Sequence, residues 1–283
     1  MIDSDVITAT LRGLVYVGSI GVAGSMLFAL SYPQAMSACR AALRGQAIAG
    51  FCLLLVVEPL RYVAFQLAIA GGDWGLAFGP DLIGMGFETP IGQAAATRLL
   101  AAAAILFVGF RIPAIGLAAA FAMIGSFLLE GHTAAGEMPI ILAALLFVHL
   151  TSVHWWLGAL CPLLALLRNA QPATAIATIE TFSTRAVLVV PALLTAGALL
   201  AVLLAGDYIR LDSAYLQRLA IKLVLVAGLL AIAAFNKLRL TPLLGRDFQL
   251  GAARLRSSIC VEISIALTVL AATAWLVGAA PDS

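Results

Sequence analysis

The sequence predicts an all-α integral membrane protein, a polytopic helix bundle that forms a single domain over residues 1–283. Hydrophobic residues make up 63% of the chain and charged residues only 11%, with a mean hydropathy of +1.08. About a quarter of the residues in a soluble chain are charged, so this composition excludes an ordinary soluble domain. Apolar runs of about 20 residues, the length that spans a bilayer, also recur from end to end.

Eight such runs predict eight transmembrane helices. They cover 8–31, 45–70, 92–110, 112–130, 138–167, 185–205, 215–236 and 257–279. The break between the third and fourth runs rests on Arg111 and Pro113, because a charge and a proline both end helices. Merging these two runs would give seven helices and place the termini on opposite sides. The Gly-rich, aromatic connection at 71–92 predicts a short outward cap with Trp74 at the membrane interface.

The charges of the connections predict the orientation. The connections after the first, third, fifth and seventh helices are basic and carry Arg40, Arg44, Arg111, Arg168, Lys237, Arg239, Arg246, Arg254 and Arg256. The connections after the second and fourth helices are acidic and carry Asp73, Asp81, Glu88 and Glu137. Basic connections stay in the cytoplasm, so both termini are expected to face outward. The net charge of +2 gives no indication of a nucleic-acid partner.

All three histidines fall within residues 130–158. His132 is expected in the turn at the outer mouth. His149 lies about 16 Å along a helix from Met138, near the middle of a hydrocarbon core about 30 Å thick. His154 lies about 7 Å deeper and is rotated by about 140°. Because imidazole binds soft and borderline metal ions, and polar groups in membranes tend to be functional, these residues predict a metal path.

Each candidate also has a simpler interpretation. His132 could cap a helix end in water, and His149 could hydrogen-bond a neighbouring helix. His154 could orient its helix beside the adjacent tryptophans. Met138, a candidate soft ligand at the mouth, could serve packing alone.

Trp156 follows His149 by seven residues and therefore lies on nearly the same helix face. The pair could form one wall of a cavity. Gly158 would let another helix approach closely.

Five ionisable residues lie within the predicted spans: Glu58, Arg61, Arg98, Lys222 and Glu262. Glu58 and Arg61 are three residues apart on one helical face and can form a pair. These charges could fix the packing as buried pairs, or they could line a hydrated path with Glu58 near its centre. Periodicity does not say which of them meet, so both interpretations stay open.

Several motifs along the chain resemble the CopD copper-resistance family, most strongly from 130 to 281. They are Glu88-Thr-Pro-Ile-Gly92 followed by Arg98; Gly131-His-Thr-Ala-Ala135; His149 with Trp156 and Gly158; Phe182-Ser183; Lys222; Asn236-Lys237 with Leu240 and Pro242; and Arg254 through Glu262. The resemblance implies an eight-helix protein of the bacterial inner membrane that moves copper, in the direction of import. In that membrane the outward-facing termini expected from the loop charges would be periplasmic. It implies His132 and His149 as the metal-handling residues. His154 does not belong to the family pattern.

The resemblance further implies a periplasmic copper-binding partner of the CopC type. This chain has no fused CopC-like β-domain, so that partner is expected to be a separate protein. Imidazoles with a thioether favour Cu(I) over Cu(II) as the ion. The outer connections are poor in histidine and methionine, which favours transient passage of the ion over tight capture.

Three functions are compatible with these residues. The first is a copper transporter, not an enzyme; neither G-x-x-x-x-G-K-[ST] nor Asp-Lys-Thr-Gly occurs, so no nucleotide-driven pump is expected. The second is a membrane subunit that delivers copper to a cuproenzyme. The third is a b-type haem protein that carries electrons, in which His149 and a partner would bind one haem.

Overall fold

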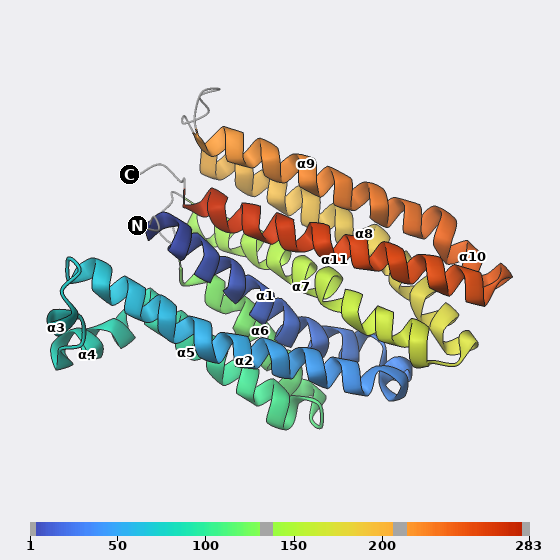
Figure 1. Cartoon of the computed structure of the whole chain (residues 1–283), viewed down its shortest axis with the longest axis horizontal. Helices are drawn as coiled ribbons and strands as arrows, with labels where there is room; N and C mark the ends of the chain where they lie inside the picture. The colour runs from blue at the N-terminus through green and yellow to red at the C-terminus, as the bar shows by residue number, and fades with distance from the viewer. Residues whose placement is uncertain (1–3, 131–137, 206–213, 279–283) are drawn as a thin grey trace.

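The structure is a computed structural model that describes residues 4–130, 138–205 and 214–278, and within these ranges it is helical and contains no strand (Figure 1). The α-helices are α1 (Ser4–Ser31), α2 (Met36–Ile69), α3 (Trp74–Ala77), α4 (Pro80–Glu88), α5 (Pro90–Ala104), α6 (Pro113–Gly125), α7 (Pro139–Asn169), α8 (Pro172–Ala205), α9 (Ala214–Phe235), α10 (Thr241–Arg246) and α11 (Phe248–Val277). Short 3₁₀ segments form η1 (Pro33–Ala35) and η3 (Ser126–Leu128), and π-helical turns form η2 (Ile105–Gly109) and η6 (Asn236–Leu240).

Seven helical segments of the described ranges are long and apolar enough to cross a membrane. An eighth apolar helix, Pro113–Leu128, is shorter. It begins where the sequence placed the break, because Pro113 occupies the first turn of α6 and cannot continue the preceding helix. α6 packs against α5 and η2, so the third and fourth apolar runs form two separate helices. The chain is therefore a multi-pass, all-α membrane protein.

Three long helices begin well before their apolar runs. α2 starts at Met36, where 45 was predicted, α8 at Pro172, where 185 was predicted, and α11 at Phe248, where 257 was predicted. The apolar run marks only the part of a helix that lies in lipid. Adding a residue to an existing helix costs little, so each helix continues through polar residues until a stop signal. Asp247 supplies such a signal for α11, since its carboxylate accepts a hydrogen bond from the Leu250 amide at 3.1 Å.

The predicted cap at 71–92 contains the two short helices α3 and α4. Asp73 caps α3 by accepting hydrogen bonds from the amides of Gly75 at 2.7 Å and Leu76 at 3.2 Å. The side chain of Trp74 is 62% exposed, as expected of a residue at a membrane interface.

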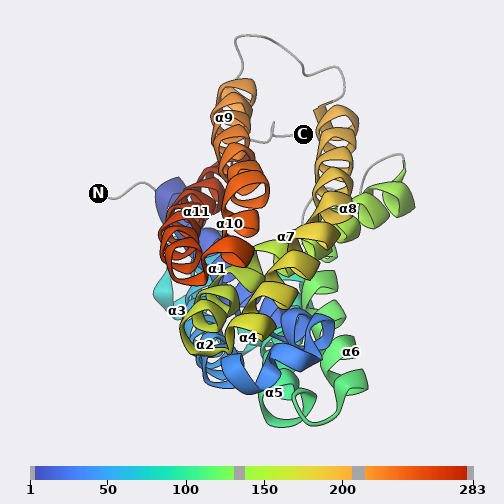
Figure 2. The same ribbon diagram turned by 90° about the vertical axis from the view of Figure 1, so that its right-hand side faces the viewer.

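α1 and α7 form the centre of the bundle (Figures 1 and 2). α2, α5 and α6 lie on one side of them, and α8, α9 and α11 lie on the other. α1 and α7 approach closely at Gly24 and Gly158, where a β-carbon on Gly24 would lie 2.6 Å from the Cα atom of Gly158. The prediction that Gly158 lets a neighbouring helix approach is confirmed.

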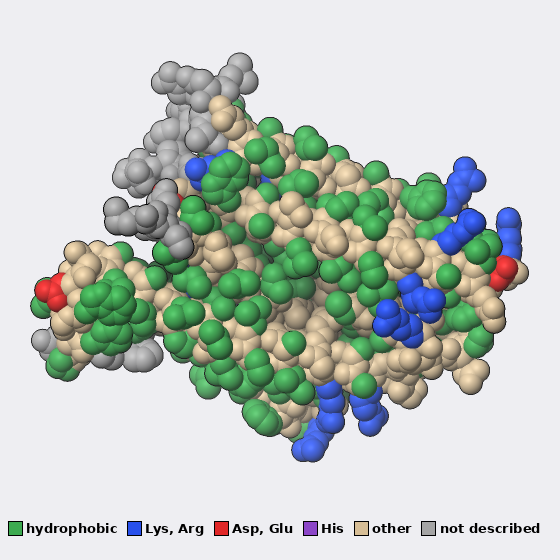
Figure 3. All heavy atoms as spheres, viewed as in Figure 1, with side chains coloured by type: hydrophobic (Ala, Val, Ile, Leu, Met, Phe, Trp, Pro, Cys, Tyr) green, Lys and Arg blue, Asp and Glu red, His purple; other side chains and the backbone are tan. Residues whose placement is uncertain are grey.

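The two ends of the bundle differ in charge. The first residues of α1 and the last residues of α11 share one end with α3 and α4, which we name the terminal end (Figure 1). At the opposite end, named the α10 end, lie α10 and the connection between α7 and α8. Lys and Arg side chains gather toward the α10 end in Figure 3, which is the distribution from which the orientation was predicted.

Candidate functional site

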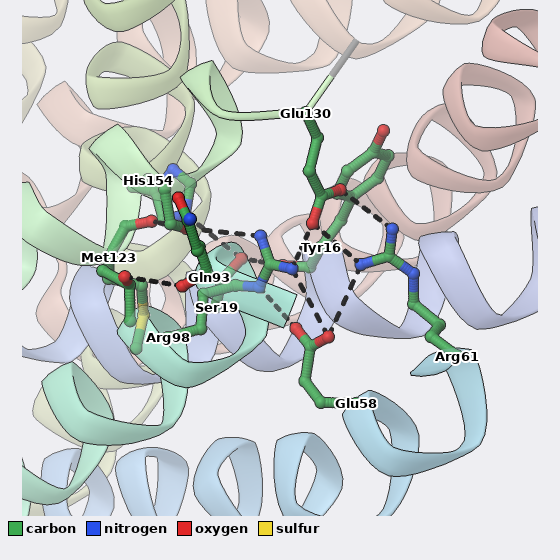
Figure 4. Close-up of polar contacts among 11 residues, drawn as sticks. Tyr16, Ser19, Glu58, Arg61, Gln93, Arg98, Met123, Glu130 and His154 are labelled. Carbon is green, nitrogen blue, oxygen red and sulfur yellow. Dashed lines mark hydrogen bonds and ion pairs between the residues drawn. The ribbon is translucent and has the colours of Figure 1, made fainter. Parts of the chain in front are cut away.

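Four charged side chains form a buried group between α2, α5 and the segment that follows η3. We name Glu58, Arg61, Arg98 and Glu130 the charge quartet (Figure 4). Arg98 donates to both carboxylates, to Glu58 through Nε and to Glu130 through Nη2. Arg61 donates to Glu130 Oε2 at 2.8 Å and lies 3.5 Å from Glu58 Oε2. The predicted pairing of Glu58 with Arg61 is confirmed, but the stronger partner of each residue comes from another segment.

The quartet is balanced in charge and mostly withdrawn from solvent. The side chains of Arg98 and Glu58 are 0% and 1% exposed, whereas those of Arg61 and Glu130 are 11% and 18% exposed. Burial alone would raise the pKa of the Glu130 carboxyl, but Arg98 and Arg61 more than offset this and hold that pKa below its ordinary value of 4.5. Because every carboxylate already binds a guanidinium, the quartet holds helices together and offers no open metal site.

Arg98 also anchors η3. Its Nη1 lies 3.3 Å from the hydroxyl of Ser126, and its guanidinium stacks 4.9 Å from the centre of the Phe127 ring. The hydroxyl of Ser126 in turn donates to the Met123 carbonyl at 2.6 Å. The sequence did not single out Glu130, whose one signal was its place two residues before the histidine of the predicted mouth.

His154 has partners for both of its ring nitrogens. Its Nδ1 lies 2.7 Å from the Leu150 carbonyl, which can only accept, so the proton is on Nδ1. Its Nε2 lies 3.3 Å from the hydroxyl of Ser19 on α1, whose single proton it shares with the Tyr16 carbonyl, 3.0 Å from the same oxygen. The residue is 2% exposed, and its ring lies 6.3 Å from that of Phe127. His154 therefore joins α7 to α1 and η3, and its nitrogens are already engaged.

His149 lies five residues earlier on α7 and turns toward α8. Its Nδ1 lies 3.1 Å from the Leu193 carbonyl, which again places the proton on Nδ1. Its Nε2 consequently carries a lone pair, and the residues that the structure describes provide no partner for it. A ligating histidine usually has this arrangement, with one nitrogen donating to a carbonyl and the other free for the metal.

Gly197 makes the space that the His149 ring occupies. A β-carbon at this position would lie 2.9 Å from both Cε1 and Nδ1 of the imidazole, closer than real side chains approach. No pattern in the sequence distinguishes Gly197, because small residues are common throughout α8.

Trp156 lies on the same side of α7 as His149. It is 4% exposed and packs with Leu193, Leu229 and Ala266 of α8, α9 and α11. Leu193, whose carbonyl lies against His149, belongs to the same cluster as Trp156, and the two α7 residues therefore share the face that was predicted for them. Lys222 of α9 is half-buried and lies within electrostatic reach of His149.

Two polar contacts join the helices of the C-terminal half toward the α10 end. Glu262 of α11 is 4% exposed, and its Oε2 accepts from Asn236 Nδ2 at 3.0 Å. Lys237 donates through Nζ to the carbonyl of Ser183 at 3.0 Å and lies 3.3 Å from its hydroxyl. Residues that carried the family resemblance, far apart in the sequence, therefore contact one another here.

The remaining candidates are not part of these contacts. Met138 precedes α7 and is 45% exposed. His132 lies outside the described residues, so its role stays a prediction. The described residues contain no group of three or more His, Cys, Asp or Glu side chains that could hold a metal ion.

Comparison with protein families identifies the class of this chain. Residues 1–140 match the family model described as copper resistance protein D-like, N-terminal domain, and residues 176–276 match copper resistance protein D. The chain belongs to the copper resistance protein D family. No curated protein and no solved structure is significantly similar to it.

Proposed function

We propose that the chain transports copper across the bacterial inner membrane, in the direction of import from the periplasm. Family membership supports a role in copper resistance or transport. In this proposal the seven long helices and the shorter Pro113–Leu128 helix all cross the bilayer, which places both termini and the terminal end in the periplasm. The basic α10 end then faces the cytoplasm.

The observation that carries the proposal is the geometry of His149. The Leu193 carbonyl holds the proton on Nδ1 and leaves the Nε2 lone pair unused among the described residues. An imidazole nitrogen suits Cu(I), and one protein ligand holds the ion weakly enough to release it. His132 would receive copper at the mouth, while His154, whose nitrogens are engaged, would act as a structural contact.

The proposal includes a protein partner that supplies the copper. A site with few ligands cannot accumulate a scarce ion by itself, so a separate periplasmic copper-binding protein of the CopC type would deliver copper to the mouth. Nothing in the chain favours nucleotide hydrolysis as the energy source, and the ion gradient or membrane potential would drive the passage.

A haem protein receives less support. Two axial histidines of one haem must face each other across the ring. His149 contacts α8 and His154 contacts α1, so the two described histidines point to different neighbours. Delivery of copper to a cuproenzyme would use the same ligand and differs only in the fate of the ion.

The test is the copper content of cells, measured by elemental analysis, at matched levels of membrane protein. Wild type should accumulate copper, and His149→Ala and His149→Asn should both lose the accumulation. The asparagine amide can still donate to the Leu193 carbonyl but supplies no imidazole nitrogen. Val148→Ala, at the neighbouring 44% exposed residue, is the matched control and should behave as wild type.

Equal copper in wild type and His149→Ala would contradict the role of His149. No net uptake, together with a cuproenzyme that copurifies with the chain, would favour delivery over import.

A further inference from the structure

Glu262 is a buried acid that forms no ion pair with any residue the structure describes. Its one described hydrogen bond comes from the neutral amide of Asn236. The Oδ1 atom of that amide is itself buried and has no hydrogen-bond partner in the described part of the chain. Glu58, buried to a similar extent, lies against two guanidiniums. The two acids therefore meet opposite environments in one membrane bundle.

The helices packed against α11 offer Glu262 no counter-charge. Between Gly13 and Ser31, α1 has one titratable side chain, Tyr16, and no charged one. α7 contributes His154, already bonded to Leu150 and Ser19, and the thiol of Cys161. Toward the α10 end, α7 and α10 carry a basic residue only in their last turns, Arg168 and Arg246.

The cations of α9 and η6 also form no ion pair with Glu262. Arg218 donates to the Trp275 carbonyl at 2.8 Å, and Arg239 is exposed. Lys222 lies fourteen residues before Asn236, or about 21 Å along the helix axis. Lys237 is the neighbour of Asn236, but its ammonium group binds Ser183 on α8.

An ionised carboxylate is unfavourable in this position, because the side chain is withdrawn from solvent and no described cation compensates its charge. Binding a proton removes that charge and adds an O–H donor to a region with an unused carbonyl oxygen on Asn236. We infer that Glu262, together with Asn236, forms a proton-binding site in the interior of the C-terminal half.

Other ligands fit this pair less well. Cu(I) prefers nitrogen and sulfur donors, and Ca²⁺ or Mg²⁺ requires about six oxygen ligands. Glu262 and Asn236 provide a carboxyl and one amide oxygen. A proton needs a single acceptor atom.

The proton site is separate from His149. One face of α9 and η6 carries Lys222, Leu229 and Asn236 at intervals of seven residues. One face of α7 carries His149 and Trp156 at the same interval. Trp156 packs against Leu229 and Ala266, so an apolar layer lies between the His149 level and the Glu262 level. A transport cycle that opened this layer would let the copper site and the proton site influence each other. This coupling, unlike the proton site, rests on the proposed copper transport.

Infrared spectroscopy of the purified chain in lipid nanodiscs tests the site without copper. At neutral pH the wild type should show the C=O stretching band of a protonated carboxylic acid, and Glu262→Gln should lack it. Glu88→Gln, which removes an exposed acid on α4, is the control and should keep the band. Glutamine resembles the protonated acid in shape, so the melting temperature of Glu262→Gln should match that of wild type.

Asn236→Leu provides a second readout that keeps Glu262 in place. The band should persist but shift in frequency, because the amide no longer donates to the carboxyl. A neutral-pH spectrum with no band that depends on Glu262 would overturn the proton site.

Copper flux into proteoliposomes then tests the coupling. Over the roughly two pH units in which the infrared band titrates, wild-type flux should change by up to about tenfold and level off on either side, as expected for one proton. Glu262→Gln should lack this step in its pH dependence. The same pH dependence in both proteins would overturn the coupling, whereas absence of flux in wild type would contradict the proposed function and leave the infrared result intact.

Discussion

The charge quartet and the polar residues of the C-terminal half use ionisable side chains in opposite ways. In the quartet, Glu58 and Glu130 are saturated by Arg61 and Arg98. In the C-terminal half, His149 keeps a free nitrogen and Glu262 has only an amide for a partner among the described residues. Paired charges determine how helices pack, while unpaired ones retain the capacity to bind an ion or a proton. One half of the bundle therefore uses its buried charges to hold helices together, and the other half keeps side chains that can still bind a ligand.

The largest expected effect comes from breaking the quartet. Arg98→Gln should lower the free energy of unfolding by about 3–5 kcal/mol, because it leaves buried carboxylates without their main counter-charge. Thermal or denaturant unfolding of the purified protein in detergent measures the loss. Lys222→Gln is the matched control in the C-terminal half and should change the free energy of unfolding by less than about 1 kcal/mol, because Lys222 forms no described ion pair. Similar losses in the two variants would refute the distinction drawn between the halves.

A smaller effect should separate function from stability within the C-terminal half. Gly197→Ala places a methyl group 2.9 Å from the His149 ring and must displace the imidazole from the Leu193 carbonyl. Disturbing the partner that orients a ligand weakens metal binding about 10–100-fold. Competition with a Cu(I) chelator measures that affinity. Gly228→Ala on α9, whose β-carbon would meet nothing within 4 Å, should bind copper as the wild type does. Equal affinities in both variants would argue against His149 as the ligand.

The smallest expected effect is the pH dependence of the Glu130 contacts. Because the pKa of Glu130 is lower in the folded protein than its ordinary value of 4.5, these contacts stabilise the fold fully above that value. The stabilisation should disappear as the pH falls through the lower folded-state pKa. Since Glu130 is partly exposed, we expect about 1 kcal/mol. Melting curves of wild type and Glu130→Gln should therefore differ at neutral pH and converge in acid. A difference that persists at the lowest pH would contradict the ion pairing of Glu130.

The sequence determined the class of this protein because hydropathy alone dictates which segments enter lipid. Apolar runs identified every long helix, and Arg111 with Pro113 located the turn between α5 and α6. Helix starts at Met36, Pro172 and Phe248 escaped prediction, because a helix extends past its apolar run to the next cap or proline. The motifs around His149 and Asn236 indicated the family, which the family comparison confirmed.

Only the tertiary structure decided which polar side chains meet. Spacing on one helix predicted the contact of Glu58 with Arg61, since both lie on one face. Spacing on one helix could not predict the contacts of Arg98 with Glu58 and Glu130, because these residues lie 40 and 32 positions apart on different segments. His149 and His154 look alike in sequence but have different surroundings. His149 packs against Gly197 and has one ring nitrogen without a partner among the described residues. His154 contacts its own helix through one nitrogen and α1 through the other. Contacts between side chains of different helices depend on how the helices pack in three dimensions, and the hydropathy of the sequence does not specify that packing.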